Sequence, residues 1–149
     1  MSSNGNLKNL NGTRDVLARL SELKETQIVT ATRTAGRKAM QIVADDAVRT
    51  ASSFDDPDTD VSIADNIAIR TSYSRVTGDL TIKVGVLGGA RYRRGDKEKG
   101  IPSHWRYVEF GTEHTAAQPF MRPAMDNNQQ QVFQTFMNEL RAGISRRLK

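Results

Sequence analysis

Four side chains that can bind a metal ion or transfer a proton gather in one short stretch of the sequence. The two histidines, His104 and His114, stand there together with Glu109 and Glu113. A zinc site on a helix needs a spacing such as His-Glu-x-x-His, which this stretch lacks. We therefore interpret both histidines as structural residues at the corner of a sheet, and we expect neither a metal ion nor a cofactor.

Other kinds of catalysis also lack their sequence motifs. A Ser-His-Asp hydrolase would place its serine in a Gly-x-Ser-x-Gly turn, which does not occur in this chain. The glycines of residues 85–90 follow a predicted strand, but their spacing differs from that of phosphate-binding loops. The chain has no cysteine, which excludes disulfides, thiolate ligands and cysteine nucleophiles. We expect that the protein is not an enzyme.

The chemistry that the sequence does offer is positive charge in a loop. Residues 88–103 show no periodicity, and a loop of this length inside a compact domain is usually functional. Exposed Arg and Lys side chains can contact phosphates without reading base sequence. Two interpretations stay open, contact with DNA or ordering against a neighbouring subunit. The cations in question are Arg91, Arg93, Arg94, Lys97 and Lys99.

Helices must position these residues, and apolar periodicity predicts where they lie. An alanine-rich stripe at three- and four-residue spacing predicts a helix from about residue 25 to 53 that can approach a sheet or another helix closely. A second stripe, residues 132–148, predicts a C-terminal helix that begins near Pro123. Leucines between residues 13 and 23 predict a short helix before these two.

Alternation of apolar and polar residues predicts β structure between the long helices. Two alternating runs, 67–73 and 80–86, flank a turn at residues 76–79. This pattern is typical of an antiparallel hairpin with one buried face, here within residues 63–87.

Residues 104–110 are expected to form a third strand, with Trp105, Tyr107 and Glu109 on one face. The predicted fold class is α+β, in which a long N-terminal helix and a C-terminal helix pack on a small antiparallel sheet. Residues 1–11 are polar and predict a flexible arm. Residues 12–149 suit a single domain.

Two sequence runs resemble the hallmark of a bacteriophage family. Residues 104–112 read His-Trp-Arg-Tyr-Val-Glu-Phe-Gly-Thr, and residues 117–124 read Ala-Gln-Pro-Phe-Met-Arg-Pro-Ala. They resemble the gene-product-ten-like tail component family of long-tailed double-stranded DNA phages, also called neck or tail-completion proteins. Residues 55–67 and 77–87 resemble its lambdoid branch. The resemblance covers about residues 13–148 and keeps the order of the elements.

Two features depart from the family pattern. Asp60 follows Thr59 where many relatives have Thr-Gly, so the turn after the first long helix can differ. The basic loop is a variable region, so the resemblance implies nothing about DNA contact there.

The resemblance implies a structural virion protein at the head–tail junction, called a tail-completion or head–tail joining protein. Such proteins assemble as a ring at the top of the tail, around the channel through which the genome passes. The implied fold is α+β, and the family has no known catalytic residues. The signature positions hold the corner and its intersubunit contacts; here they are Trp105, Glu109, Phe110, Gly111, Thr112, Pro119, Phe120, Arg122 and Pro123.

The resemblance also implies partners and a location. The expected partners are further copies of the chain, in a ring whose sixfold symmetry matches the tail, and the tail-terminator and head-connector or stopper proteins. The tail tape-measure protein and the passing DNA, held without sequence specificity, are further expected contacts. No apolar run reaches membrane-spanning length, so we expect no membrane contact. We expect assembly in the host cytoplasm and residence in the virion.

The residues alone leave one alternative function. The basic loop 91–99 and the net charge of +5 also suit a nucleic-acid-binding packaging or DNA-end factor.

Overall fold

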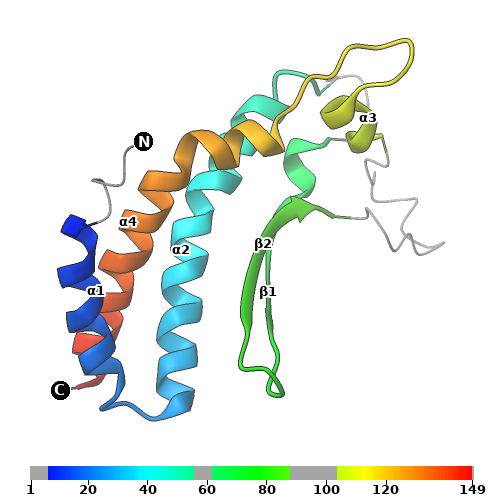
Figure 1. Ribbon diagram of the computed structural model, residues 1–149. Coiled ribbons are helices and arrows are strands. Elements are labelled where there is room, and N and C mark those ends of the chain that lie inside the picture. Colours follow the sequence, from blue (N-terminus) through cyan, green and yellow to red (C-terminus); the bar gives the residue numbers. More distant parts are fainter. Residues whose placement is uncertain (1–6, 56–61, 88–103, 149) are drawn as a thin grey trace.

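The computed structural model describes residues 7–55, 62–87 and 104–148. Along the chain it has α1 (Leu7–Leu20), α2 (Glu25–Ala51), the 3₁₀ turn η1 (Ala64–Asn66), β1 (Ile67–Tyr73), β2 (Leu80–Val86), α3 (Trp105–Phe110) and α4 (Met121–Arg147). Figure 1 shows α1 against α4, α4 beside α2, and the β1–β2 hairpin along the other side of α2. This arrangement confirms the predicted α+β class.

The two long helices, α2 and α4, form the centre of the molecule and run antiparallel. The alanine stripe of α2 is buried, and small residues face it from α4. A Cβ atom added to Gly143 would lie 3.6 Å from the Cβ of Ala31. Lys38 of α2 pairs with Glu139 of α4 at 2.9 Å. The close helix–helix approach predicted from the alanines is confirmed.

The hairpin packs on α2 through one face. β1 and β2 are antiparallel, from Ile67 opposite Val86 to Tyr73 opposite Leu80. Gly78 lies in the turn between them with a φ of 75°. A residue with a side chain would be strained in that backbone conformation, so glycine suits this position. Gly36 of α2 is buried against Ile82 of β2, and a Cβ atom at Gly36 would collide with the Ile82 side chain. Helix and sheet therefore meet without a side chain on the helix at that point.

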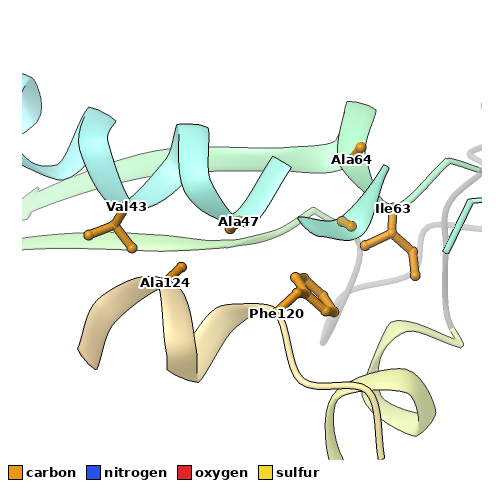
Figure 2. Packing of buried hydrophobic residues seen from close by; sticks show 7 residues of the cluster. Val43, Ala47, Ile63, Ala64, Phe120 and Ala124 are labelled. Carbon is orange, nitrogen blue, oxygen red and sulfur yellow. The ribbon is translucent and has the colours of Figure 1, made fainter. Parts of the chain in front are cut away.

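Two hydrophobic clusters hold these layers together, one toward each end of the α2–α4 pair. Phe120, at the start of α4, lies fully buried near Ile63 and Ala47 in the first core cluster (Figure 2). The members of this cluster are Val43, Ala47, Ala51, Ile63, Ala64, Phe120 and Ala124. The second core cluster joins α1 to the long helices through Val16, Ala31, Ala35, Leu140 and Ile144.

The third-strand prediction is wrong, because residues 104–110 form a helix instead of a strand. α3 spans Trp105–Phe110, so Trp105 and Glu109 lie one turn apart and do not share a strand face with Tyr107. Within the described residues the sheet has the two strands of the hairpin. The apolar residues of α3 are spaced in a way that fits either a strand or a helix. The hydrogen bonds from the start of α4 to Glu109 favour the helix.

Other boundaries differ less. The first helix begins at Leu7, so the segment predicted as a flexible arm is helical from that residue onward. The last helix begins at Met121, which places Pro123 in its first turn as predicted. The basic loop with Arg91, Arg93, Arg94, Lys97 and Lys99 lies outside the described residues. In the described part of the chain, no helix combines the length and apolar character that membrane crossing requires.

Candidate assembly surface

A buried carboxylate joins α3 to the start of α4. Glu109 is 6% exposed. Its Oε2 accepts hydrogen bonds from the backbone N–H of Phe120 at 2.8 Å and of Met121 at 3.0 Å. Its Oε1 accepts one from the N–H of Arg122 at 3.0 Å. A negative charge at the positive end of a helix is also electrostatically favourable.

Pro123 completes this arrangement. The first four N–H groups of an α-helix have no partner within the helix. At the start of α4 those positions are Phe120, Met121, Arg122 and Pro123, and the proline has no N–H to satisfy. Glu109 accepts from the other three. Because every amide is accounted for, the helix can begin inside the core, where Phe120 is buried.

A short hydrogen-bonded loop brings Glu109 to this position. Gly111 ends α3 with a φ of 74°, and a Cβ there would lie 2.8 Å from the backbone N of Ala117. Thr112 Oγ1 accepts hydrogen bonds from the N–H groups of His114 at 3.3 Å and Thr115 at 3.0 Å. The N–H of Gln118 then returns to the carbonyl of Val108 at 2.8 Å. The sequence Glu-Phe-Gly-Thr therefore encodes a rigid corner.

Phe110 has a different position from its neighbours in the signature. Its side chain is 65% exposed, and Tyr107, one turn earlier on the same side of α3, is 63% exposed. Phe110 also borders a hollow of about 410 Å³ between α3 and the start of α4. We call the residues around this hollow the corner surface: Glu109, Phe110, Ala117, Pro119, Arg122, Pro123, Asp126 and Asn127.

The structure thus brings most of the predicted signature together. Five of the nine positions, namely Glu109, Phe110, Pro119, Arg122 and Pro123, line the hollow. Gly111 and Thr112 shape the loop beside it, and Phe120 lies in the first core cluster.

Trp105 stands apart from the hollow and packs against the first core cluster. The guanidinium of Arg106 lies 5.5 Å from the centre of its ring, within the range of a cation–π contact. The indole Nε1 is buried and has no hydrogen-bond partner among the described residues. Its packing on the cluster, not a hydrogen bond of the indole, is what Trp105 contributes to the placement of α3 on the core.

Both histidines were predicted to lie at the corner of a sheet, and this prediction is wrong. His104 precedes α3, His114 lies in the loop after it, and both side chains are exposed. Glu109, the carboxylate between them, is turned toward α4. Among the described residues no group of three or more His, Asp or Glu side chains is placed to hold a metal ion.

One structural carboxylate was missed. Asp55 follows the C-terminus of α2 and accepts hydrogen bonds from Ser62 Oγ at 2.9 Å, the N–H of Ile63 at 2.8 Å and the N–H of Ala64 at 2.9 Å. It fixes η1 and so places Ile63 in the first core cluster. In the sequence, Asp55 stands two residues before Pro57, a pattern that indicates a turn but not these three hydrogen bonds.

The chain matches the model of a known protein family. The family model described as "Bacteriophage HK97-gp10, putative tail-component" matches residues 14–111. The match includes α2, the hairpin and α3 through Gly111, while Thr112 and the start of α4 lie beyond it. Neither a comparison with curated proteins nor one with solved structures gives a match.

Proposed function

The chain belongs to the HK97-gp10-like family of bacteriophage tail components, and on that premise we propose that it is a structural subunit of the head–tail junction. In this proposal it completes the tail and enables head–tail joining as one subunit of a ring around the DNA channel. The ring, with sixfold symmetry to match the tail, forms by contact between copies through the corner surface. A tail component resides in the virion, and the proposal adds its place at the neck.

The exposed aromatic pair supports the corner surface as the contact. Large aromatic side chains are enriched at the buried centres of protein interfaces. Tyr107 and Phe110 project from a helix whose other side is fixed by Trp105 and Glu109, so the backbone that carries them is already in place before a partner binds. A rigid anchor loses little conformational freedom on binding.

A second copy of the chain is the occupant that this surface suits best. The hollow beside Phe110 has apolar walls from Ala117, Pro119 and Pro123. Arg122 and Asp126 place both signs of charge at its margin. A surface that carries an anchor, a cavity and both charges can meet a different face of an identical subunit, and repetition of such a head-to-tail contact closes a ring.

The remaining partners follow from the proposed place in the virion. The faces of the ring would contact the tail-terminator protein and the head-connector or stopper protein, and the tape-measure protein would lie below. DNA would pass through the centre without sequence-specific contact. Assembly would take place in the host cytoplasm.

We test the proposal with particles of a phage that encodes this chain. If the chain is a neck component, mass spectrometry should find it in purified virions and in isolated tails. Loss of the gene should leave filled heads and tails that do not join. Phe110→Ser should reproduce this defect, since it removes the anchor while the folded chain keeps its melting temperature within a few degrees.

Val76→Ser is the matched control. Val76 is 96% exposed at the tip of the hairpin, so its replacement removes a similar exposed apolar group elsewhere. It should restore infectious particles as well as the wild-type chain does. The proposal is wrong if the chain occurs only in lysates and never in purified tails, or if Phe110→Ser complements as fully as Val76→Ser.

A further inference from the structure

The outer face of the hairpin carries two positive charges directly opposite each other. Arg70 of β1 and Lys83 of β2 are cross-strand partners, so both side chains leave the same face of the sheet. Both are exposed, whereas Ile82 and Val84 on the other face turn toward α2. Like charges in this relation destabilise a sheet. Folding therefore brings together two charges that repel each other.

The described part of the chain supplies no counter-charge to this pair. The ion pairs found there join Arg19 to Asp15, Lys38 to Glu139 and Arg49 to Asp46. Neither Arg70 nor Lys83 takes part in one. Two carboxylates lie near the turn end of the hairpin, where Glu25 accepts a hydrogen bond from the Tyr73 hydroxyl and Asp79 belongs to the turn itself.

Small side chains surround the two charges. Ala68 lies opposite Gly85 on one side of the pair, and Ser72 lies opposite Thr81 on the other. The centre of a protein–protein interface usually contains aromatic or other large apolar side chains and is depleted in lysine. This face has no such anchor among its cross-strand pairs. Arg, Lys, Ser and Thr are, by contrast, the side chains that contact phosphate oxygens.

Two more cations lie near the turn, on the side of the hairpin that faces α2. Arg75 lies in the turn beyond β1 and borders a hollow of about 530 Å³ between α2 and the hairpin, which Glu25 and Tyr73 also line. Arg33 of α2 lies on the other side of the same hollow. These two cations belong to the inner side of the hairpin, so the outer face is defined by Arg70 and Lys83.

We propose that the outer face of the hairpin, centred on Arg70 and Lys83, binds the phosphodiester backbone of duplex DNA without reading its base sequence. The binding energy comes from Arg and Lys side chains that displace counterions from the phosphates, with the hydroxyls of Ser72 and Thr81 beside them. This surface differs from the basic loop 91–99. All of its residues come from one copy of the chain, so DNA binding by this surface does not require ring formation.

The decisive variant is Arg70→Glu, which changes DNA binding and stability in opposite directions. It places a carboxylate opposite Lys83, so the cross-strand repulsion becomes an attraction and the melting temperature should stay constant or rise. Fluorescence anisotropy with a labelled duplex of mixed sequence should show affinity at least about tenfold weaker at low salt. The slope of log affinity against log salt should become less steep by about 1 for each phosphate that the variant no longer neutralises.

Arg14→Glu is the control with the same change in net charge. Arg14 is exposed on α1, away from the hairpin, so its replacement should change affinity less than about threefold. The triple variant Arg91→Gln, Arg93→Gln, Arg94→Gln tests the loop and should retain the binding that Arg70→Glu loses.

Several outcomes would overturn the proposal. One is that the wild-type chain does not bind duplex DNA at low salt. Another is that Arg70→Glu and Arg14→Glu weaken binding equally, or that only the loop variant weakens it. Poly-glutamate and unlabelled DNA can be compared as competitors at equal negative charge. If poly-glutamate displaces the labelled duplex equally well, the face suits an acidic protein segment and the assignment to DNA is wrong.

Discussion

Glu109 shows how one side chain can decide the geometry of a corner. A helix that begins in the core would otherwise bury three free amides, each of which is costly without a partner. Its carboxylate accepts from all three at 2.8 to 3.0 Å, across eleven to thirteen residues of sequence. A serine or aspartate cap adjacent to α4 would satisfy one or two amides, but it would not tie α3 to the helix.

Replacement of Glu109 by glutamine should therefore destabilise the fold. The glutamine side chain would keep one acceptor oxygen and turn its amide group toward the N–H of Arg122, so at least one charge-assisted bond is lost. We expect Glu109→Gln to lower the free energy of unfolding by about 2 kcal/mol in urea titrations. Glu113→Gln, in the exposed loop, should change it by less than about 0.5 kcal/mol. Equal effects of the two substitutions on the free energy of unfolding would contradict a stabilising role for the hydrogen bonds of Glu109.

Sequence alone could identify the signature residues but not their separate roles. Phe110 and Phe120 both belong to the recognised runs, yet one is 65% exposed and the other fully buried. Residue type is the same in both cases, and burial depends on which side of the corner each ring faces. The alternation in residues 67–73 and 80–86 puts Arg70 and Lys83 on the polar faces of their strands, but only the cross-strand register shows that they stand opposite each other.

At the scale of elements, long periodic segments were predictable and the short one was not. α2, β1 and β2 lie close to their predicted bounds because each repeats its pattern over seven or more residues. α3 has six residues. In so short a run, the apolar positions Trp105, Tyr107, Val108 and Phe110 fit alternation and helical spacing alike. The deciding contact, from Glu109 to the amides of α4, is not local in sequence.

A side-chain bond ties the hairpin to the start of α2. The Tyr73 hydroxyl donates to Glu25 Oε1 at 2.9 Å. This bond is the main cause that raises the pKa of Tyr73 above its ordinary value of 10.0; desolvation and the charge of Glu25 add to it, and Arg75 opposes it. The bond requires the protonated phenol. Its contribution to stability is therefore present below about pH 10 and is lost as the pH rises through the raised value.

This dependence can be measured with Tyr73→Phe. The wild-type chain should melt at a higher temperature than the variant from neutral pH to about pH 9. The difference should shrink as the pH passes the raised pKa, because Tyr73 ionises in the folded chain and repels Glu25. Measuring the difference between the two proteins cancels the titration of the other tyrosines. A difference that stays constant up to about pH 11 would contradict the assignment of this bond.

At the scale of the whole molecule, stability is distributed unevenly along the α2–α4 pair. The first core cluster receives side chains from α2, η1 and α4, with α3 and the hairpin packed around it. Among the side chains of α1 described from residue 12 onward, Val16 is buried in the second cluster and Leu20 is partly buried against it, while Leu17 is 60% exposed. The hydrogen bond from Arg19 to Ser145 is exposed and 3.4 Å long. α1 is therefore more weakly attached than either of the two long helices, α2 and α4.

Hydrogen exchange should resolve this difference. We expect the amides of α1 to exchange through local opening, and those in the middle of α2 and α4 to exchange only on global unfolding. Phe120→Ala removes a fully buried ring and should lower the global free energy of unfolding by about 3–5 kcal/mol. Protection of α2 and α4 should fall by that amount while protection of α1 stays unchanged. If α1 lost protection in parallel, it would belong to the same cooperative unit as α2 and α4, and its weaker attachment would be contradicted.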